Sequence, residues 1–535
     1  MAYGSETVTL RASIRRRAAA RGTLIVGGGL AGVFCALKLA PQPVTILTAG
    51  PFGEGGSSVW AQGGMAAAVA TGDTPEKHLA DTIAAGAGIV DVAMASLMTH
   101  AARARIEDLL SYGVPFDRAI DGRLLTGREA AHSERRIVHV QGDTAGKAIM
   151  AALVERVRAT PSIQVIENVV AEDLILSDGR VVGVMARGQG GRAGDAVGFT
   201  ARNVVLASGG SGHLYAVTTN PPESSGNGIA LAARAGAVLA DLEFVQFHPT
   251  ALDVGRDPAP LATEALRGEG ATLINSLGER FMTKIDPLGE LAARDIVARA
   301  IHAERAAGRK VFLDARTAIG AAFSRKFPTV YAFCREAGID PAVEPIPMAP
   351  AAHYHMGGVF TDAHGRTTVP GLWACGEVAS TGVHGGNRLA SNSLLEAVVF
   401  ATQVANDIAG EMDGGAGFVE TDSSVSVAAR APTAADDSLT SLIRQTMARD
   451  VGVVRDHDGL ARAIATFDRL AAQRPSTQVA NRLTVARMIA VAALDRTESR
   501  GGHYRSDYPE PVSLKARRSF TRLDQADAYA VAAAE

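Results

Sequence analysis

A glycine-rich turn near the start of the chain is the feature that most restricts its fold. The apolar run Thr23–Val26 leads into the segment Gly27–Gly32, which matches the pattern Gly-x-Gly-x-x-Gly. A helical stretch over 33–40 follows, and a second apolar run covers 44–47. This order predicts the first βαβ unit of a doubly wound parallel sheet. It also predicts a dinucleotide site, because unpaired N–H groups at the start of the helix attract phosphate.

The end of the second predicted strand departs from the usual dinucleotide pattern. An acidic residue is typical there, where it binds a ribose hydroxyl. This chain has Thr48-Ala49 instead. Either the Thr48 hydroxyl performs this task or the ribose is held from elsewhere in the chain.

Length and composition limit the class of protein. With 535 residues the chain is too long for one ordinary domain. Its 53 basic and 56 acidic residues nearly balance, which argues against a dedicated nucleic-acid-binding protein. Three scattered cysteines argue against a disulfide framework or an iron–sulfur cluster. No apolar run reaches the ~20 residues of a spanning helix, so we expect a soluble protein of the cytoplasm.

Residues 1–21 form a basic N-terminal tail that contains five arginines and one acidic residue. A solvated, poorly ordered tail is the favoured interpretation. An organelle transit peptide is the alternative, since such peptides are also rich in arginine and poor in acidic residues. No long apolar segment follows the arginines, so a secretory signal is not expected.

Eight short motifs, spaced along most of the chain, carry the strongest signal. They are Gly27–Gly32, Ser57–Gly64, Gln246–Thr250, Thr263–Gly270, Arg294-Asp295, His353–Gly358, Gly376-Glu377 and Asn387–Glu396. Together they resemble the succinate dehydrogenase/fumarate reductase flavoprotein superfamily and, within it, the L-aspartate oxidase family. The resemblance covers residues 22–510, with the motifs in the expected order.

This resemblance implies an α/β fold in which a Rossmann-like FAD-binding domain is interrupted by an α+β capping domain and followed by a C-terminal helical bundle. The FAD-binding domain would comprise residues 22–242 and 353–410, and the capping domain 243–352. A composition rich in Gly, Ser, Asp and Ala predicts a linker over 411–437. Helical periodicity predicts the helical domain over 438–535. Closure of the cap over the flavin would assemble the active site.

The family likeness implies oxidation of L-aspartate to iminoaspartate by hydride transfer from Cα to flavin N5, as the first step of NAD biosynthesis. The FAD would be non-covalent, because Ser57–Trp60 holds no histidine that could bind it covalently. Reduced flavin would pass its electrons to O2, giving H2O2, or to fumarate, giving succinate. The imine would be handed to quinolinate synthase, and neither nucleic acid nor a membrane is an expected partner.

Three other functions are compatible with parts of this pattern. A soluble fumarate reductase would lack rapid amino-acid oxidation, and Glu129 is the residue that separates it from an oxidase. A subunit of a membrane respiratory complex usually carries covalent flavin, so the missing histidine near Ser58 counts against it. A non-enzymatic flavin-binding scaffold would not need a complete set of dicarboxylate-binding residues, so the presence of that set counts against it.

Glu129 is the residue that the likeness assigns to substrate selection. It lies in the segment 125–133, which is similar to the part of the oxidases that places a glutamate near the substrate amine. An α-ammonium group needs an anionic neighbour, whereas succinate has no such group. From the bare sequence, the alternative is a surface carboxylate paired with Arg128 or Arg135.

The remaining substrate contacts follow from the needs of a four-carbon dicarboxylate, which requires two cationic or donor-rich clamps. The family pattern places Arg388 and His353 at one carboxylate. It places His248 at the other, with Thr263 and Glu264 nearby. Glu264 cannot bind an anion while it is ionised, so we expect it to orient an arginine or a histidine.

Arg294 lies in a helical run over 291–301, where an arginine is normally solvated. In the related fumarate reductases the matching arginine delivers a proton to the substrate carbon. The guanidinium group is normally a poor acid, so this role would need a relay through Glu264 or Arg267. Amine oxidation needs no such donor, and Arg294 would then only stabilise charge.

The same pattern assigns the cofactor contacts and no metal ligand. His353 and His355 stand two residues apart, but no third ligand follows at metal-site spacing. Asn227 replaces the aspartate of the family pattern, so its amide can still form hydrogen bonds but carries no charge. The residues expected to contact FAD are Gly27, Gly28, Gly29, Leu30, Ala31, Gly32, Thr48, Ser57, Ser58, Gln62, Gly63, Gly64, Ala171, Asn227, Glu377, Asn392, Ser393 and Leu394.

Overall fold

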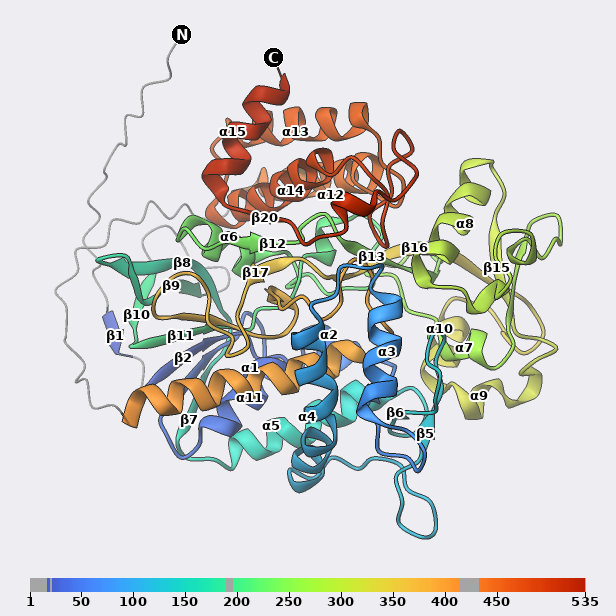
Figure 1. Ribbon diagram of the computed structural model, residues 1–535, viewed down its shortest axis with the longest axis horizontal. Helices are drawn as coiled ribbons and strands as arrows, with labels where there is room; N and C mark the ends of the chain where they lie inside the picture. The colour runs from blue at the N-terminus through green and yellow to red at the C-terminus, as the bar shows by residue number, and fades with distance from the viewer. Residues whose placement is uncertain (1–16, 20–21, 189–195, 414–432, 535) are drawn as a thin grey trace.

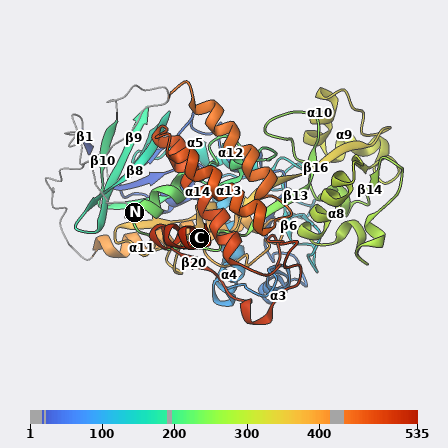
Figure 2. The same ribbon diagram turned by 90° about the horizontal axis from the view of Figure 1, so that it is seen from above.

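The computed structural model describes residues 17–19, 22–188, 196–413 and 433–534. An α/β body with a central sheet carries a separate cap on one side and a layer of C-terminal helices above it (Figure 1). Turned by 90°, the molecule shows the cap again at the side away from the sheet of β8, β9 and β10 (Figure 2). The expected α/β fold with an inserted cap and a C-terminal helical region is confirmed.

The central sheet has five parallel strands, in the order β18-β11-β2-β3-β7. Its inner strands are runs of Val, Ile and Leu buried on both faces, as a sheet covered by helices requires. The predicted βαβ unit is confirmed, although its helix begins at Leu30, three residues earlier than expected. The elements are β2 (Thr23–Val26), α1 (Leu30–Leu39), β3 (Val44–Leu47), β7 (Ile163–Ile166), β11 (Asn203–Leu206), β18 (Leu372–Ala374) and the long helix α11 (Asn392–Asp413), which packs on α1.

A second sheet lies beside the first and includes a short strand from the N-terminal tail. Strands β8 (Val169–Ser177), β9 (Arg180–Gly188) and β10 (Val197–Thr200) form an antiparallel meander. Strand β1 (Arg17–Ala19) pairs in parallel with β10. Part of the predicted tail is therefore a strand, while residues 1–16 and 20–21 lie outside the described residues.

The cap is an antiparallel sheet covered by helices, with a hydrophobic core of its own. Strand β16 continues past residue 352, so it joins the cap to the flavin-binding part without a break. Its elements are β13 (Val245–Leu252), α7 (Ala265–Gly268), β14 (Thr272–Asn275), α8 (Arg294–Ala306), β15 (Val311–Asp314), α9 (Phe323–Lys326), α10 (Pro328–Glu336) and β16 (Ile346–His355).

The C-terminal part is helical, as predicted: α12 (Asp436–Asp450), α13 (His457–Ala471), α14 (Thr477–Asp495) and α15 (Leu523–Ala534). Helix α11 runs to Asp413 and so enters the predicted linker, although its last core residue is Ile408. Residues 414–432 of that linker lie outside the described residues.

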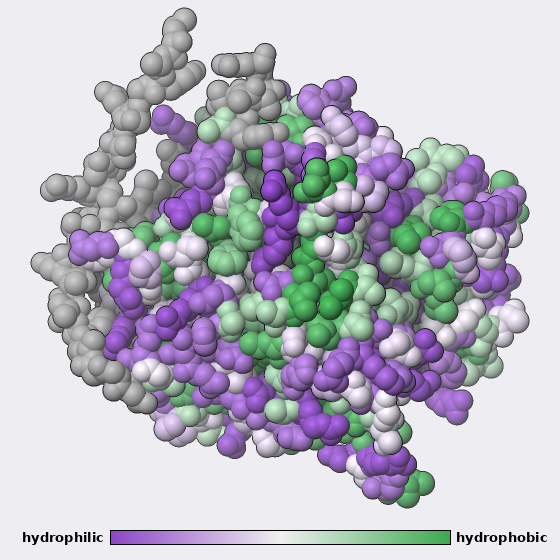
Figure 3. Space-filling view, in the orientation of Figure 1, coloured by the Kyte–Doolittle hydropathy of each residue, from purple (hydrophilic) through white to green (hydrophobic). Residues whose placement is uncertain are grey.

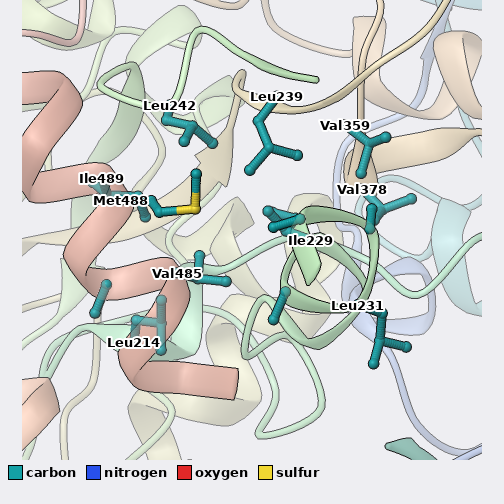
Figure 4. Packing of buried hydrophobic residues seen from close by; sticks show 14 of the residues in the cluster. Leu214, Ile229, Leu231, Leu239, Leu242, Val359, Val378, Val485, Met488 and Ile489 are labelled. Carbon is teal, nitrogen blue, oxygen red and sulfur yellow. The ribbon is translucent and has the colours of Figure 1, made fainter. Parts of the chain in front are cut away.

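The C-terminal helices share one hydrophobic core with the flavin-binding part. Helix α14 is buried along most of its length, packs on α6 (Asn227–Arg234) and shares a hydrophobic core with β12 (Leu239–Ala240) and β17 (Gly358–Phe360). Figure 4 shows Val485, Met488 and Ile489 of α14 facing this group of residues, which includes Ile229, Leu231, Leu239 and Val359. The bundle is therefore part of the main body.

The remaining helices and strands connect the parts described above. They are α2 (Ser57–Trp60), β4 (Met65–Ala66), α3 (Pro75–Ala85), α4 (Val92–Ser111), β5 (Thr126–Gly127), β6 (Ile137–Val138), α5 (Ala145–Arg158), β19 (Ala379–Ser380) and β20 (Phe520–Thr521). Hydrophilic residues cover most of the rim of the face in Figure 3, and hydrophobic ones gather near its centre. Within the described ranges, none of the helices combines the length and apolar character needed to cross a membrane.

Candidate active site

A cavity of about 810 Å³ lies at the carboxyl ends of the central strands. The segments that follow four neighbouring strands line it: 27–31 after β2, 48–52 after β3, 207–209 after β11 and 375–377 after β18. Parallel strands end at the same edge of a sheet, and the crevice there is the usual ligand site of doubly wound folds. The volume lies in the range of small-molecule and cofactor sites.

The glycine turn has the geometry that a bound dinucleotide needs. Gly27 has a φ of +118°, and a Cβ there would lie 2.1 Å from the carbonyl oxygen of Ala207. A Cβ at Gly32 would lie 2.1 Å from the carbonyl oxygen of Gly27, so α1 packs directly on the turn. Gly29, the N-cap of α1, offers no side chain to its first N–H groups. The N–H of Leu30 donates to Oγ of Ser58 over 3.1 Å, and the turn and helix start line the cavity, where they fit a bound pyrophosphate.

Most of the residues expected to contact the cofactor line this cavity, and two do not. Gly32 packs helix against turn. Asn392 is fully buried behind the cavity wall, where its side chain is hydrogen-bonded to His78 and Thr82. The residues that line the cavity are Gly27, Gly28, Gly29, Leu30, Ala31, Thr48, Ser57, Ser58, Gln62, Gly63, Gly64, Ala171, Asn227, Glu377, Ser393 and Leu394.

Thr48 and Asn227, the two departures from the expected pattern, both bind the protein itself. The Thr48 hydroxyl donates to the carbonyl oxygen of Gly50 over 2.7 Å. Asn227 donates through Nδ2 to the carbonyl oxygen of Ala171 and accepts through Oδ1 from Nδ2 of Asn481, both over 2.7 Å. The Asn227 amide thus connects the cavity wall to helix α14.

Glu377 is a partly buried carboxyl group in the cavity wall. Its Oε1 accepts a hydrogen bond from the backbone N–H of His355 over 3.0 Å. Burial raises the pKa of Glu377 to about 7, although this hydrogen bond favours the ionised form. Glu377 therefore stays protonated to a higher pH than a free carboxyl group does.

The expected catalytic residues come together from three distant parts of the chain. Loop 128–136 brings Glu129, and the segment before α11 brings Arg388. The cap supplies the others through β13, the start of α7, the start of α8 and β16. Those that line the cavity are Glu129, His248, Glu264, Arg294, His353 and Arg388. Thr263 is buried but is absent from the cavity wall.

Arg294 is buried and fixed on two sides. Its Nε donates to Oε2 of Glu264 over 2.6 Å, and its Nη1 donates to Oε1 of Gln246 over 3.0 Å. Helix α8 begins at this residue, not at 291, so Arg294 stands at the helix end that faces the cavity. Burial alone would raise the pKa of Glu264, but Arg294 and Arg267 outweigh it and lower that pKa.

Arg388 is a buried guanidinium with spare hydrogen-bonding capacity. Its Nη1 donates to Oγ of Ser393 over 3.3 Å, and its Cζ lies 4.5 Å from the centre of the Tyr354 ring. Its Nε has no hydrogen-bond partner among the described residues. Burial and the nearby positive charge of Arg294 lower the pKa of Arg388 to about 10. An anion placed here would relieve both penalties.

The two histidines of the site are neutral hydrogen-bonding groups. Their rings are in contact, with centroids 5.0 Å apart. Burial, followed by the positive charge of Arg294, lowers the pKa of both His248 and His353 well below the ordinary value. Nδ1 of His353 lies 2.8 Å from Oγ1 of Thr219, which fixes its ring. Both are therefore able to bind a carboxylate by hydrogen bonding without adding charge.

Glu129 is buried, with 7% of its surface exposed, so the surface-carboxylate alternative does not hold. Its Oε2 accepts a hydrogen bond from Oγ of Ser391 over 2.7 Å. Arg128 and Arg135 instead donate to the carbonyl oxygens of His132 and Thr126. Burial, together with the negative charge of Glu264, raises the pKa of Glu129.

Three residues of the site were not predicted: Gln246, Tyr354 and Ser391. Gln246 joins the two arginines, because it accepts from Arg294 and donates through Nε2 to the carbonyl oxygen of Arg388 over 2.8 Å. Tyr354 supports the Arg388 guanidinium. Each stands inside or beside a motif already noted, but its partner lies in a distant segment, which spacing along the chain does not reveal.

Two protein-family models match the chain. A model described as an FAD binding domain matches residues 22–394. A model described as the fumarate reductase flavoprotein C-term matches residues 475–533. The first covers the cavity and the cap, and the second covers α14 and the segment that follows it.

Curated relatives and solved structures extend this likeness over nearly the whole chain. The L-aspartate oxidase of Caulobacter vibrioides is 51% identical over 94% of this chain and 96% of its own. That of Streptomyces coelicolor is 43% identical over 96% and 93%. The FrdA chain of E. coli quinol fumarate reductase superposes with a TM-score of 0.85 at 27% identity, covering 95% of both chains. Mycobacterium smegmatis Sdh1 gives 0.80 at 32% identity, covering 92% and 90%.

Proposed function

Because the chain belongs to the L-aspartate oxidase family of fumarate reductase-type flavoproteins, we infer that it oxidises L-aspartate to iminoaspartate with non-covalently bound FAD. This reaction is the first step of NAD biosynthesis. The observation that carries the choice of substrate is the buried carboxylate of Glu129 in a cavity that also holds Arg294 and Arg388. Because Glu264 pairs with Arg294, Glu129 is left to meet an ammonium group and Arg388 to meet a carboxylate.

The residues at the strand ends are proposed to hold FAD. The start of α1 would bind the pyrophosphate, and Glu377, Ser393 and Leu394 would lie along the rest of the cofactor. When bound, FAD accepts a hydride from Cα of the substrate and later passes electrons to O2 or fumarate.

The two carboxylate clamps follow from the free donors in the cavity. Arg388, with its unpaired Nε, and His353 would hold one carboxylate. His248 would hold the other. Arg294 is proposed to stabilise its charge, because Glu264 and Gln246 fix the guanidinium in place. Thr263 would act only through its neighbour Glu264. The protein aligns the Cα–H bond and excludes water.

Glu129 is proposed to bind the substrate ammonium and to accept its proton. Substrate oxidation to the imine requires the amine to lose a proton. A carboxylate with a raised pKa is a better proton acceptor than a free one. A fumarate reductase, the alternative, has no use for an anion at this position, since its substrates carry no amine.

The direct test is anaerobic mixing of the purified yellow protein with L-aspartate, D-aspartate and succinate, followed by flavin absorbance. L-Aspartate alone should bleach the flavin. Glu129→Gln should slow this bleaching at least ~30-fold, because it leaves the ammonium unpaired in a buried site. The matched control is Glu134→Gln, an exposed carboxylate of the same loop that pairs with Lys77. Bleaching by succinate, or none by L-aspartate, would favour the reductase.

Two further proposals concern the cellular context. Iminoaspartate hydrolyses in water, so we propose that it is handed to quinolinate synthase. We also propose the cytoplasm as the location, a reducing compartment that suits the three buried free thiols Cys35, Cys334 and Cys375.

A further inference from the structure

A buried polar group lies directly behind Glu129 and does not touch the cavity. Arg136 is fully buried, and its guanidinium donates through Nε and Nη2 to both carboxylate oxygens of Asp73 over 3.0 Å. It also binds Asp81, which in turn accepts from the backbone N–H and hydroxyl of Ser133. This group anchors the far end of loop 128–136, the loop that carries Glu129.

His132 connects this group to the segment before α11, next to Ser391 in the cavity wall. Its Nδ1 lies 3.1 Å from Nη1 of Arg136, and its Nε2 lies 3.0 Å from the carbonyl oxygen of Ala390. A guanidinium only donates and a carbonyl only accepts. The ring must therefore accept at Nδ1 and donate at Nε2, which defines one neutral tautomer. Burial lowers the pKa of His132 to about 4, in agreement with a neutral ring.

The turn that His132 holds is the one that contacts Glu129. Ser391, the next residue, has a φ of +61°, a left-handed conformation that a non-glycine residue adopts only when its surroundings enforce it. Its carbonyl oxygen accepts from the backbone N–H of Ala66 over 3.1 Å. With Ala390 and the Ser391 backbone fixed, Oγ of Ser391 donates to Oε2 of Glu129, while Oε1 lies beside Gly63.

We propose that His132 is a positioning residue for amine recognition. It binds Ala390 from the loop that carries Glu129, and Ser391, the residue after Ala390, binds the Glu129 carboxylate, so the hydrogen bonds form a closed ring. This inference rests on the proposed function, because it requires Glu129 to bind the substrate ammonium. Arg388 is supported separately, by the Tyr354 ring and Gln246. Loss of His132 should therefore weaken amine recognition more than carboxylate binding.

The test compares two substrates in the FAD-loaded enzyme: L-aspartate oxidation, and reduction of fumarate, which has no amine, by a reduced viologen dye. His132→Phe fills the space without a donor or acceptor, whereas His132→Gln keeps one of each. We expect His132→Phe to lower kcat/KM for L-aspartate at least ~10-fold and that for fumarate by less than ~3-fold. His132→Gln should retain L-aspartate activity within ~3-fold.

Two further variants keep the test decisive if His132→Phe does not fold. Ser391→Ala should show the same loss confined to L-aspartate. In a Glu129→Gln background, Ser391→Ala should cause no further loss, because Ser391 acts through Glu129. Equal losses for both substrates, an unaffected Ser391→Ala, or additive losses would overturn the inference. Failure of the wild-type enzyme to oxidise L-aspartate would instead refute the proposed function.

Discussion

Arg388 and Arg294 place two positive charges in one buried cavity, and among the residues that the structure describes only Arg294 has a carboxylate partner. Glu264 neutralises Arg294, whereas Arg388 has a ring, a hydroxyl group and an unpaired Nε. A buried charge without a counter-ion is costly, and the lowered pKa of Arg388 expresses that cost. A substrate carboxylate would supply the missing partner, so we expect its binding to be stabilised by the unpaired charge of Arg388 in the free enzyme.

Arg388→Lys should therefore weaken substrate binding although it keeps the charge. Lysine presents a point charge and cannot form the two parallel hydrogen bonds of a guanidinium. We expect KM for L-aspartate to rise about 10- to 100-fold, the equivalent of one lost hydrogen bond to a charged group. Steady-state kinetics at equal FAD content checks this, and an unchanged KM would show that Arg388 does not bind the substrate.

Glu377 should make the stability of the apoprotein depend on pH. Its folded pKa of about 7 lies above its ordinary value, so its stabilising contribution is complete below pH ~4 and is lost as the pH rises through 7. Between pH 5 and 8 the wild-type apoprotein should lose about 2 to 3 kcal/mol of unfolding free energy relative to Glu377→Gln. Urea titrations at both pH values measure this difference, and parallel pH profiles would contradict it.

The sequence motifs predicted which residue types form the site, but not the pairs that they make. Arg294, Glu264 and Arg388 stand in recognisable motifs, and all three line the cavity. Asn392 stands in the same motif as Arg388, yet it is the first residue of helix α11 and its side chain is hydrogen-bonded to His78 and Thr82 behind the cavity wall. Contacts such as Ser391 to Glu129 depend on how distant segments pack, which local patterns do not encode.

At the scale of elements, side chains of the flavin-binding part form hydrogen bonds to the backbone of the cap. Helix α10 of the cap begins without a capping side chain of its own. Asp143, from the loop before α5, accepts from the backbone N–H groups of Thr329 and Val330 and from the Thr329 hydroxyl. Gln62 likewise donates to the carbonyl oxygen of Leu261 in the cap. These contacts hold the cap over the cavity.

Asp143→Ala should loosen the start of α10. Loss of a capping carboxylate costs ~1 kcal/mol, which corresponds to about fivefold faster hydrogen exchange at the first turn. Exchange followed by mass spectrometry should show this in residues 328–336 and leave α14 unchanged. Asp143→Asn is the matched control, since asparagine also caps helices; equal exchange in the alanine and asparagine variants would argue against capping.

Some helices and strands could be predicted from the sequence, and others could not. The glycine turn predicted α1 and its two strands, and periodicity predicted the C-terminal helices. The start of α8 at Arg294 was not predicted, because Leu291 and Ala292 continue the apolar pattern although residues 289–291 form a separate turn. Strand β1 was missed because the pairing of Arg17–Ala19 with β10 is a long-range contact.

For the whole molecule, the shared core predicts that the flavin-binding part and the C-terminal helices unfold together. Met488 of α14 is 1% exposed within this core. Met488→Ala should lower the free energy of unfolding by about 2 to 5 kcal/mol. In urea titrations, flavin release and the loss of helix should both move to the same lower midpoint. The surface control Leu442→Ala in α12, which is 40% exposed, should change stability by less than ~0.5 kcal/mol. Two separate transitions, with only one shifted, would contradict a common core.

The shared core also has a consequence for synthesis of the chain. The apolar faces of α6 and β12 leave the ribosome long before α14 exists to cover them. At ~5–20 residues per second, the interval between Ile229 and Leu494 exceeds ten seconds. During that time α14 cannot cover Ile229, Leu239 and their neighbours, so we expect chaperones to shield this apolar face until translation is nearly complete.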